Sequence, residues 1–336
     1  MNYCTLFNSR YLSRGIALYN SLLKNTKSFH LIIFAFDDIT FQILTKMQLE
    51  CVSVISLKDF ETQALLQVKK TRTVGEYCWT CTPFIIQYCL SQFSLEQVCY
   101  LDADLYFWGD PAELLSELKQ NSILITEHRY SPEYNNPAAG KYCVQFMLFK
   151  NNEKGLAALN WWADACLAWC YDRVEPGRFG DQKYLDDWLT RFEGVKVLQH
   201  LGGGVAPWNV QQYDLVRVEE EKIYFKEKKS LNNLKDLKEF KLIFYHFHAL
   251  KFLNKKADCG NYKLTHTIKE LLYYAYIKEL LLIEKQLREN KAVAPLLHTL
   301  LIHGESTLAF SAIKYISNLK KKYLGTYNVF SLNNIA

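Results

Sequence analysis

The chain has 336 residues, of which 49% are hydrophobic and 22% are charged. This balance excludes an intrinsically disordered chain, and the length is sufficient for one large α/β domain with additional elements. The net charge of +5 is unevenly distributed, because residues 241–336 hold 14 lysines and arginines but only 6 acidic residues. Such a basic end is compatible with contact to an anionic membrane or acidic substrate, and equally with ordinary solvated helix faces.

Cysteine usage and hydropathy indicate a cytoplasmic protein. The ten cysteines are scattered through apolar stretches without the spacing of a disulfide framework, which favours reduced thiols. Residues 1–6 lack a basic stretch followed by a long apolar run, so we expect no signal peptide. No uncharged apolar run reaches the roughly 18 residues that cross a bilayer, and Lys278 and Glu279 interrupt the nearest candidate, 271–283.

The first hundred residues alternate between strand-like and helix-like patterns. Strands are expected over residues 3–7, 31–36, 52–56 and 97–101, and helices over 11–23, 41–49 and 82–90. This order predicts an α/β fold with a mostly parallel sheet and helices on both faces. Ligands of such folds bind beyond the carboxyl ends of the strands.

The rest of the chain continues this pattern and then changes. Further strands are expected over residues 123–126, 144–149, 195–198 and 242–246, helices over 155–170 and 182–192, and a charged connection or hairpin over 219–229. After residue 260 only helices are expected, over 265–288, 293–301 and 306–323. We therefore predict a catalytic domain over residues 1–260 and a basic, helical C-terminal appendage over 261–336.

The strongest local signal lies in residues 100–106, where an apolar strand runs directly into Asp102 and Asp104. At a strand end both carboxylates can turn toward one point, and two hard oxygen ligands suit Mg²⁺ or Mn²⁺ bound with a substrate diphosphate. Two solvated loop aspartates are the simpler alternative. A haloacid-dehalogenase-like phosphatase is disfavoured, because there the motif follows the first strand and continues with Thr or Val two residues later.

Residues 100–104 resemble the Asp-x-Asp motif of GT-A glycosyltransferases, especially the family 8-like group that includes bacterial lipooligosaccharide galactosyltransferases and glycogenin. Residues 76–83, 179–186 and 205–209 are also similar to segments of bacterial surface-polysaccharide transferases. The resemblance covers roughly residues 3–252. It implies a Rossmann-like GT-A fold and a nucleotide-sugar donor, with UDP as the default nucleotide and Mn²⁺ or Mg²⁺ as the metal.

The resemblance assigns roles to individual residues of this chain. The metal ligands would be Asp102, Asp104 and His246. The residues next to the donor sugar would be Asp181 and Gln182. The donor-binding residues would be Thr5, Leu6, Phe7, Asn8, Tyr11, Asp102, Ala103, Asp104 and Lys251. The chain departs from the family at Val144, Gln145 and Phe146, where family 8 has Asn-Ala-Gly, and at Ala249, which replaces a glycine.

Several other positions are candidates for substrate contact, because they follow a strand end or a glycine loop or, for Gln145, take the place of the family's sugar-side strand. These positions are Glu127, His128, Gln145, Trp208 and Asn209. Asp181 is also a suitable helix N-cap, and the two histidines at 246 and 248 alternate on a strand and so face opposite sides. Cys78 and Cys81 have metal or redox spacing, but no second cysteine pair with zinc-like spacing accompanies them.

The expected function is therefore metal-dependent transfer of a hexose from a nucleotide-sugar to a glycan or lipid-linked saccharide. The family 8 resemblance favours retention of configuration. The alternative is a degenerate GT-A domain that binds nucleotide or glycan without turnover. A nucleic-acid partner is disfavoured, since the positive charge lies mainly in the tail. Residues 313–323 interleave apolar residues with lysines, which is typical of a helix on an anionic membrane and also of an exposed basic helix.

Overall fold

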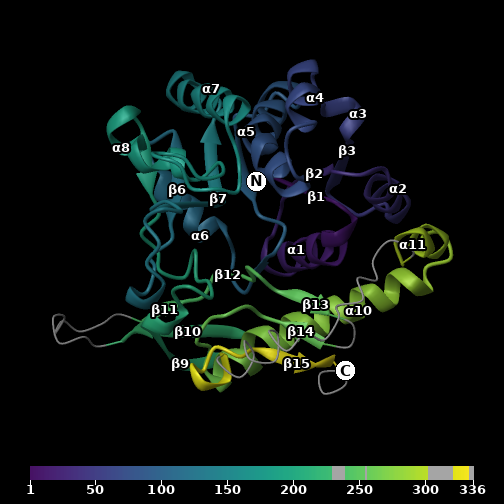
Figure 1. Ribbon diagram of the computed structural model, residues 1–336, viewed down its shortest axis with the longest axis vertical. Helices are drawn as coiled ribbons and strands as arrows, with labels where there is room; N and C mark the ends of the chain where they lie inside the picture. The colour runs from purple at the N-terminus through teal and green to yellow at the C-terminus, as the bar shows by residue number, and fades with distance from the viewer. Residues whose placement is uncertain (229–238, 254–255, 302–320, 333–336) are drawn as a thin grey trace.

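A seven-stranded sheet forms the centre of the molecule (Figure 1). The structure, a computed structural model, describes residues 1–228, 239–253, 256–301 and 321–332. In spatial order the strands are β3 (Val52–Ser56), β2 (His30–Ala35), β1 (Asn2–Phe7), β4 (Gln97–Leu101), β7 (Tyr142–Lys150), β6 (Ile123–Glu127) and β8 (Val195–Val197). All run parallel except β7, which is antiparallel to both neighbours. The predicted mostly parallel α/β sheet is confirmed.

Helices cover both faces of this sheet because alternate strand residues point to opposite sides. On one face, Cys4, Ile32 and Phe34 pack with α5 (Val74–Gln92) and α7 (Glu153–Ala168). On the other face, Tyr3 and Leu31 pack with α1 (Leu12–Asn25) and α2 (Asp38–Met47). Short helices complete the layers: α3 (Leu57–Phe60), α4 (Gln63–Lys69), α6 (Ala112–Leu115) and α8 (Trp188–Arg191).

The start of α5 is fixed by a reciprocal capping box. The Thr73 hydroxyl accepts from the backbone N–H of Glu76, and the Glu76 carboxylate accepts from the N–H of Thr73 at 2.7 Å. The other carboxylate oxygen of Glu76 accepts from the N–H of Asp172 at 2.8 Å. This helix start is therefore tied to the loop that follows α7.

Residues 182–192 differ from the sequence prediction, whereas the hairpin expected within 219–229 is present. Residues 182–192 form a 3₁₀ turn (Lys183–Asp187) followed by the single-turn α8, not one helix. The charged segment 219–229 contains the turn of a hairpin between β9 (Tyr213–Glu219) and β10 (Lys222–Glu227), to which β11 (Glu239–Lys241) adds a third strand. A pair of short strands, β5 (Leu105–Phe107) and β12 (Phe244–His246), lies beside the central sheet.

The C-terminal region is helical where helices are predicted, through α9 (His266–Ile268), a π-helical turn (Lys269–Tyr274), α10 (Ala275–Glu289) and α11 (Ala294–Leu301). The prediction of helices only is wrong, because β15 (Val329–Ser331) pairs with β14 (Lys256–Asp258), which pairs with β13 (Lys251–Leu253). Most of the predicted helix 306–323, including most of the basic segment 313–323, lies outside the described residues.

The helices after residue 260 share the core of the central domain. Leu272, Tyr276 and Leu280 belong to the same buried cluster as α1, and Figure 1 shows α10 running beside α1. The amide of Asn20 donates to Glu279 at 2.8 Å across this contact. A domain boundary at residue 260 remains a prediction, and no separate core marks it among the described residues. No helix in the described part of the chain is long and apolar enough to cross a membrane.

Candidate active site

The carboxyl ends of β1, β4 and β6 meet the amino end of β7 at one edge of the sheet, because β7 runs in the opposite direction. A cleft of about 820 Å³ opens at this edge. Asn8 follows β1, Asp102 follows β4, His128 follows β6 and Cys143 lies in β7, and all four line the cleft. The site is therefore where parallel α/β sheets generally bind ligands.

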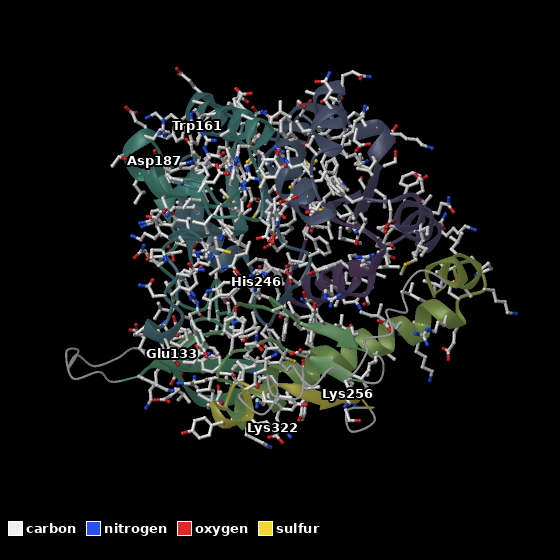
Figure 2. All side chains as sticks on the ribbon, viewed as in Figure 1. Glu133, Trp161, Asp187, His246, Lys256 and Lys322 are labelled. Carbon is white, nitrogen blue, oxygen red and sulfur yellow. The ribbon has the colours of Figure 1, made fainter. Side chains whose placement is uncertain are left out.

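Three side chains that could hold a metal ion meet in the cleft. Asp102 and Asp104 come from the turn after β4, and β5 then pairs with β12 so that Leu105 lies opposite His246. The backbone N–H of Phe247 donates to the carbonyl of Asp104 at 3.0 Å, which fixes this register. As a result, one ligand atom from each of Asp102, Asp104 and His246 lies within 4.8 Å of the other two. Figure 2 shows His246 at the centre of the molecule.

The imidazole of His246 points its Nε2 atom toward both carboxylates. Nε2 lies 3.0 Å from Oδ1 of Asp104 and 3.7 Å from Oδ2 of Asp102. The other ring nitrogen, Nδ1, lies 2.7 Å from Oε1 of Gln145, which can only accept. Gln145 therefore keeps the proton on Nδ1 and leaves the Nε2 lone pair for a cation, as supporting residues of metal-binding histidines do.

The donor set fits a divalent cation of the Mg²⁺ or Mn²⁺ type. Two carboxylates offer hard oxygen ligands, and a neutral imidazole adds nitrogen, which Mn²⁺ accepts. The hydroxyl of Tyr100 donates to Oδ1 of Asp102 at 2.8 Å and orients this carboxylate. The side chain of Asp102 is 28% exposed and that of Asp104 is 12% exposed, so the cluster remains open to the cleft.

Without metal, the cluster compensates its charge with a proton. Burial raises the pKa of Asp102, although His246 opposes this. Burial also acts to raise the pKa of Asp104, but His246 outweighs it and holds this pKa at about 2. Burial alone lowers the pKa of His246, yet the two carboxylates raise it well above its usual value. A bound cation would take the place of this proton.

Asp181 and Gln182 lie on a neighbouring part of the cleft wall. Burial, followed by repulsion from Asp102, raises the pKa of Asp181 to about 8. The indole N–H of Trp162 donates to the carbonyl of Asp181 at 2.9 Å and so holds the backbone at this position. The amide of Gln182 donates to the carbonyl of Ala139 at 2.7 Å.

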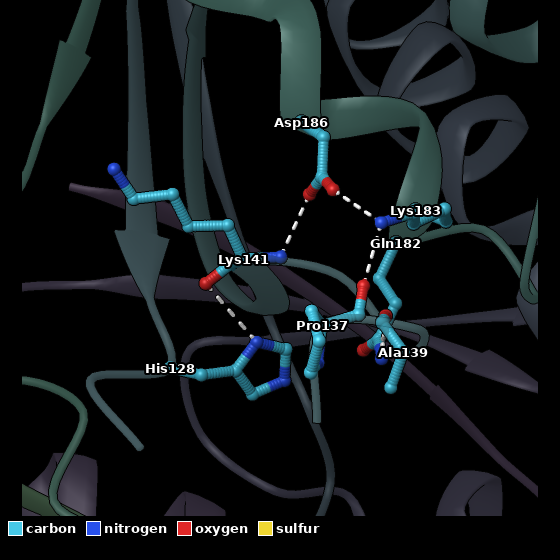
Figure 3. A network of polar contacts seen from close by, with 7 residues as sticks. All are labelled: His128, Pro137, Ala139, Lys141, Gln182, Lys183 and Asp186. Atoms are coloured by element: carbon cyan, nitrogen blue, oxygen red, sulfur yellow. Dashed lines mark hydrogen bonds and ion pairs between the residues drawn. The ribbon is translucent and has the colours of Figure 1, made fainter. Parts of the chain in front are cut away.

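The loop before β7 is attached to the turn after Gln182 by further polar contacts (Figure 3). The ammonium of Lys183 donates to the carbonyl of Pro137 at 2.6 Å and pairs with Asp186 at 2.6 Å. Asp186 also accepts from the backbone N–H of Lys141 at 2.7 Å. The carbonyl of the same Lys141 accepts from Nδ1 of His128 at 3.2 Å. Gln182 and the cleft side of this loop are therefore held together.

At the β1 end, residues that follow the strand form another part of the wall. Asn8 caps the 3₁₀ turn Ser9–Tyr11 by accepting from the N–H of Arg10 at 3.1 Å. The Tyr11 ring is 42% exposed, and the guanidinium of Arg14 lies 4.5 Å from its centre. Arg14 also donates to the carbonyl of Leu250 at 2.8 Å. The turn after β1 is thereby joined to the segment after His246.

Most of the predicted site residues line this one cleft. They are Leu6, Phe7, Asn8, Tyr11, Asp102, Ala103, Asp104, His128, Asp181, Gln182, Trp208 and His246. Outside the lining lie Thr5, which is fully buried in β1, and Lys251, which is exposed at the start of β13. Glu127 also lies outside the lining, and its carboxylate pairs with the ammonium of Lys141 at 3.9 Å. Gln145 and Asn209 are fully buried and contact other protein groups.

Trp208 and Asn209 build the wall behind the metal cluster. The Trp208 ring lies 5.3 Å from that of His246, and its N–H donates to the carbonyl of His128 at 2.9 Å. The amide of Asn209 donates to the carbonyls of His128 and Gly204 at 2.8 Å each and accepts from the N–H of Ala206 at 2.9 Å. The polar atoms of Asn209 are thus occupied within the protein, where they hold the loop around Trp208.

Several rings and polar groups of the cleft are not among the predicted site residues. They are Trp79, Thr82, Tyr134, Phe179 and Tyr262. Trp79 and Phe179 pack on each other with ring centres 6.5 Å apart. Trp79, Thr82 and Phe179 lie in the segments 76–83 and 179–186 that resemble surface-polysaccharide transferases. Tyr134 and Tyr262 carry no local signal.

Comparison with known proteins defines the class to which this fold and site belong. A family model described as nucleotide-diphospho-sugar transferase matches residues 27–250, which is more than half of the chain. The chain therefore belongs to the nucleotide-diphospho-sugar transferase family. The matched region contains the metal cluster, Asp181 and Gln182, but ends before Tyr262.

Individual relatives are similar over most of their length. The uncharacterized proteins YfnD and YfnF of Bacillus subtilis are 28% and 29% identical to this chain. The alignments cover 83% and 75% of this chain and 88% and 82% of the relatives. Among solved structures, a complex of the galactosyltransferase LgtC with donor and acceptor sugar analogues is similar with a TM-score of 0.40 and 12% identity, over 59% of this chain and 73% of that chain.

Proposed function

We propose that this protein is a metal-dependent glycosyltransferase of the GT-A type that moves a hexose from a UDP-sugar to a saccharide acceptor. The observation that carries the proposal is the cluster of Asp102, Asp104 and His246 in a member of the nucleotide-diphospho-sugar transferase family. Two carboxylates and an oriented imidazole at the strand ends are suited to a cation that also takes the oxygens of a diphosphate.

The reaction breaks the bond between the anomeric carbon and the diphosphate and forms one to an acceptor hydroxyl oxygen. A divalent cation, when bound, stabilises the negative charge of the departing diphosphate. Asp102, Asp104 and His246 hold it, and Gln145 keeps the imidazole in the productive tautomer. The acceptor hydroxyl loses its proton to the departing diphosphate. The resemblance to family 8 supports this retaining course.

Asp181 and Gln182 orient the donor sugar in this proposal. Asp181 is buried, and burial followed by repulsion from Asp102 raises its pKa to about 8 in the metal-free protein. In its protonated form Asp181 can donate a hydrogen bond to a sugar oxygen. Gln182 lines the cleft beside it while its amide N–H₂ is held by Ala139. Leu6, Phe7, Asn8 and Tyr11 flank the nucleotide at the β1 end. UDP and the hexose are supported by the family 8 resemblance.

The acceptor and the location follow from sequence features. A glycan or lipid-linked saccharide acceptor agrees with the resemblance to surface-polysaccharide transferases. Ten free cysteines are compatible with the proposed cytoplasmic location. Contact with the inner face of the membrane through the basic C-terminal segment remains a proposal, since most of residues 313–323 lie outside the described residues.

Hydrolysis of nucleotide-sugars tests the proposal against a binding protein without turnover. We would incubate the purified chain with a panel of nucleotide-sugars, with Mn²⁺, Mg²⁺ or chelator, beside Asp104→Ala and the exposed control Asp164→Asn. We expect metal-dependent release of UDP from one UDP-sugar, lost only in Asp104→Ala. Metal-dependent UDP binding with no turnover of any donor or donor–acceptor mixture would favour the non-catalytic alternative.

A further inference from the structure

The strand order gives the cleft two distinct ends. Asn8 and Tyr11 follow β1, whereas His128 and Tyr130 follow β6, two strands beyond β4 and its metal cluster. In the proposed function, on which this inference rests, the nucleotide occupies the β1 end and its diphosphate lies at the metal cluster. The β6 end is then the part of the cleft left for another ligand.

Three tyrosines line this β6 end and form what we call the tyrosine wall (Tyr130, Tyr134 and Tyr262). Each ring is half-buried. The rings of Tyr134 and Tyr262 meet edge to face with centres 5.1 Å apart, and Tyr130 stacks on His128 at 4.5 Å. The wall packs against Trp208, whose ring contacts His246. An aromatic surface thus begins beside the metal cluster at Trp208 and continues over three half-buried rings.

Hydrogen-bonding groups accompany these aromatic rings. Among the described residues, the hydroxyls of Tyr130 and Tyr262 have no hydrogen-bond partner. Asn136, an exposed residue, lines the same end of the cleft. A sugar ring has an apolar C–H face and a rim of hydroxyls. Aromatic faces and nearby phenol and amide groups complement both features.

The wall is held in place from both sides. The Tyr134 hydroxyl accepts from the backbone N–H of Lys263 at 2.6 Å, and the backbone N–H of Ser131 donates to the carbonyl of Trp208 at 3.0 Å. The loop that carries Tyr134 continues into the network around Pro137 and Ala139 (Figure 3). A rigid wall loses little conformational freedom when a ligand binds.

Tyr262 comes from the part of the chain beyond the matched family region, which ends at residue 250. Its loop is supported by the buried Asn328, whose amide donates to the carbonyl of Tyr262 at 2.6 Å and to that of Gly260 at 3.0 Å. Asn328 directly precedes β15, which pairs with β14. The part of the chain after residue 250, which we call the C-terminal segment, therefore completes the lining of the cleft. The metal cluster of the same cleft lies within the matched family region.

We propose that the tyrosine wall binds the saccharide acceptor, and that the C-terminal segment supplies part of this subsite through Tyr262. The sugar stacks on the rings of Tyr134 and Tyr262, and its hydroxyls bond to the free phenol of Tyr130 and the amide of Asn136. This placement brings the acceptor past Trp208 toward the metal cluster, where the donor's reacting carbon lies.

The test measures saccharide binding to the full chain by saturation-transfer NMR in the presence of UDP and Mg²⁺, which is diamagnetic. The probes are lactose, maltose and N,N′-diacetylchitobiose. The variants are Tyr134→Ala and Tyr262→Ala, with Tyr224→Ala as a half-buried tyrosine that does not line the cleft. Tyr262→Leu, which keeps apolar bulk but has no ring face, replaces Tyr262→Ala if the latter does not fold.

We expect at least one probe to bind the wild type, and its Kd to rise about 3- to 10-fold in each wall variant but not in Tyr224→Ala. The affinity for UDP should not change in the wall variants. The inference is overturned if no probe binds, or if the probes bind the wall variants and the wild type with the same affinity. It is also overturned if the wall variants lose affinity for UDP, because the nucleotide would then lie on the wall. Wall-dependent saccharide binding by a wild type that hydrolyses no donor would support the inference and count against the proposed function.

Discussion

Oε1 of Gln145 lies 2.7 Å from Nδ1 of His246, although the two residues are 101 positions apart in the sequence. Gln145 is fully buried in β7 and does not line the cleft, whereas His246 does. This contact determines which ring nitrogen faces Asp102 and Asp104. It also explains why a glutamine at a position where family 8 has a small residue is compatible with a metal site.

The first prediction concerns this contact. Gln145→Leu should weaken Mn²⁺ binding about 10- to 100-fold, because the imidazole loses the acceptor that fixes its tautomer and orientation. Calorimetric titration of the purified variant with Mn²⁺ measures this change directly. Gln145→Glu is the matched control, since it keeps an acceptor oxygen and should retain the metal. Equal Mn²⁺ affinity in Gln145→Leu and wild type would show that the contact has no role in metal binding.

The second prediction concerns Asp181 and pH in the metal-free protein. The folded state raises the pKa of Asp181 from 3.8 to about 8, so this group favours folding below pH 3.8 and loses its contribution as pH rises to about 8. Asp181→Asn removes this dependence. Relative to wild type, the variant should gain stability between pH 4 and 8, on the order of 2–5 kcal/mol in total.

Urea unfolding with chelator at pH 5, 7 and 9 measures this difference. Asp164→Asn, an exposed aspartate on α7, serves as the control and should follow the wild type at every pH. A difference between Asp181→Asn and wild type that is the same at all three pH values would mean that the carboxyl titrates normally.

The third prediction concerns Asn209, which the sequence analysis placed among substrate contacts. Its amide is engaged by the backbone of Ala206, His128 and Gly204, so Asn209→Ala leaves buried polar groups without partners. We expect a loss of about 1–3 kcal/mol in the free energy of unfolding. Asn160→Ala, at an exposed position on α7, should change it by less than about 0.5 kcal/mol. Urea unfolding compares the two, and equal effects would contradict an anchoring role.

The two aspartates of the metal cluster can be predicted from the sequence for a physical reason. Asp102 and Asp104 directly follow a buried apolar strand, and carboxylates at such a strand end mark the ligand edge of an α/β sheet. His246 was inferred from the family resemblance, and its approach to Asp104 depends on the pairing of β5 with β12. β5 cannot be predicted from the sequence, because its three residues are too few for a periodic pattern.

Tyr130 directly follows a predicted strand end, but the other two members of the tyrosine wall could not be predicted from the sequence. Tyr134 and Tyr262 are 128 residues apart and lie in segments without a helical or strand pattern. Only the fold brings them together, through the contact of the Tyr134 hydroxyl with Lys263. The same limit applies to β15, a short strand that is stabilised by pairing with β14 rather than by its own sequence.

The central claim is that Asp102, Asp104 and His246 hold a cation that binds the diphosphate of the donor. Calorimetric titration with UDP, with Mn²⁺ and with chelator, tests it most directly in wild type, Asp104→Asn and the control Asp164→Asn. We predict that Mn²⁺ strengthens UDP binding at least about tenfold in wild type and in Asp164→Asn, and that Asp104→Asn loses this enhancement. UDP binding that is independent of Mn²⁺ in the wild type, or an enhancement by Mn²⁺ that survives in Asp104→Asn, would contradict the account.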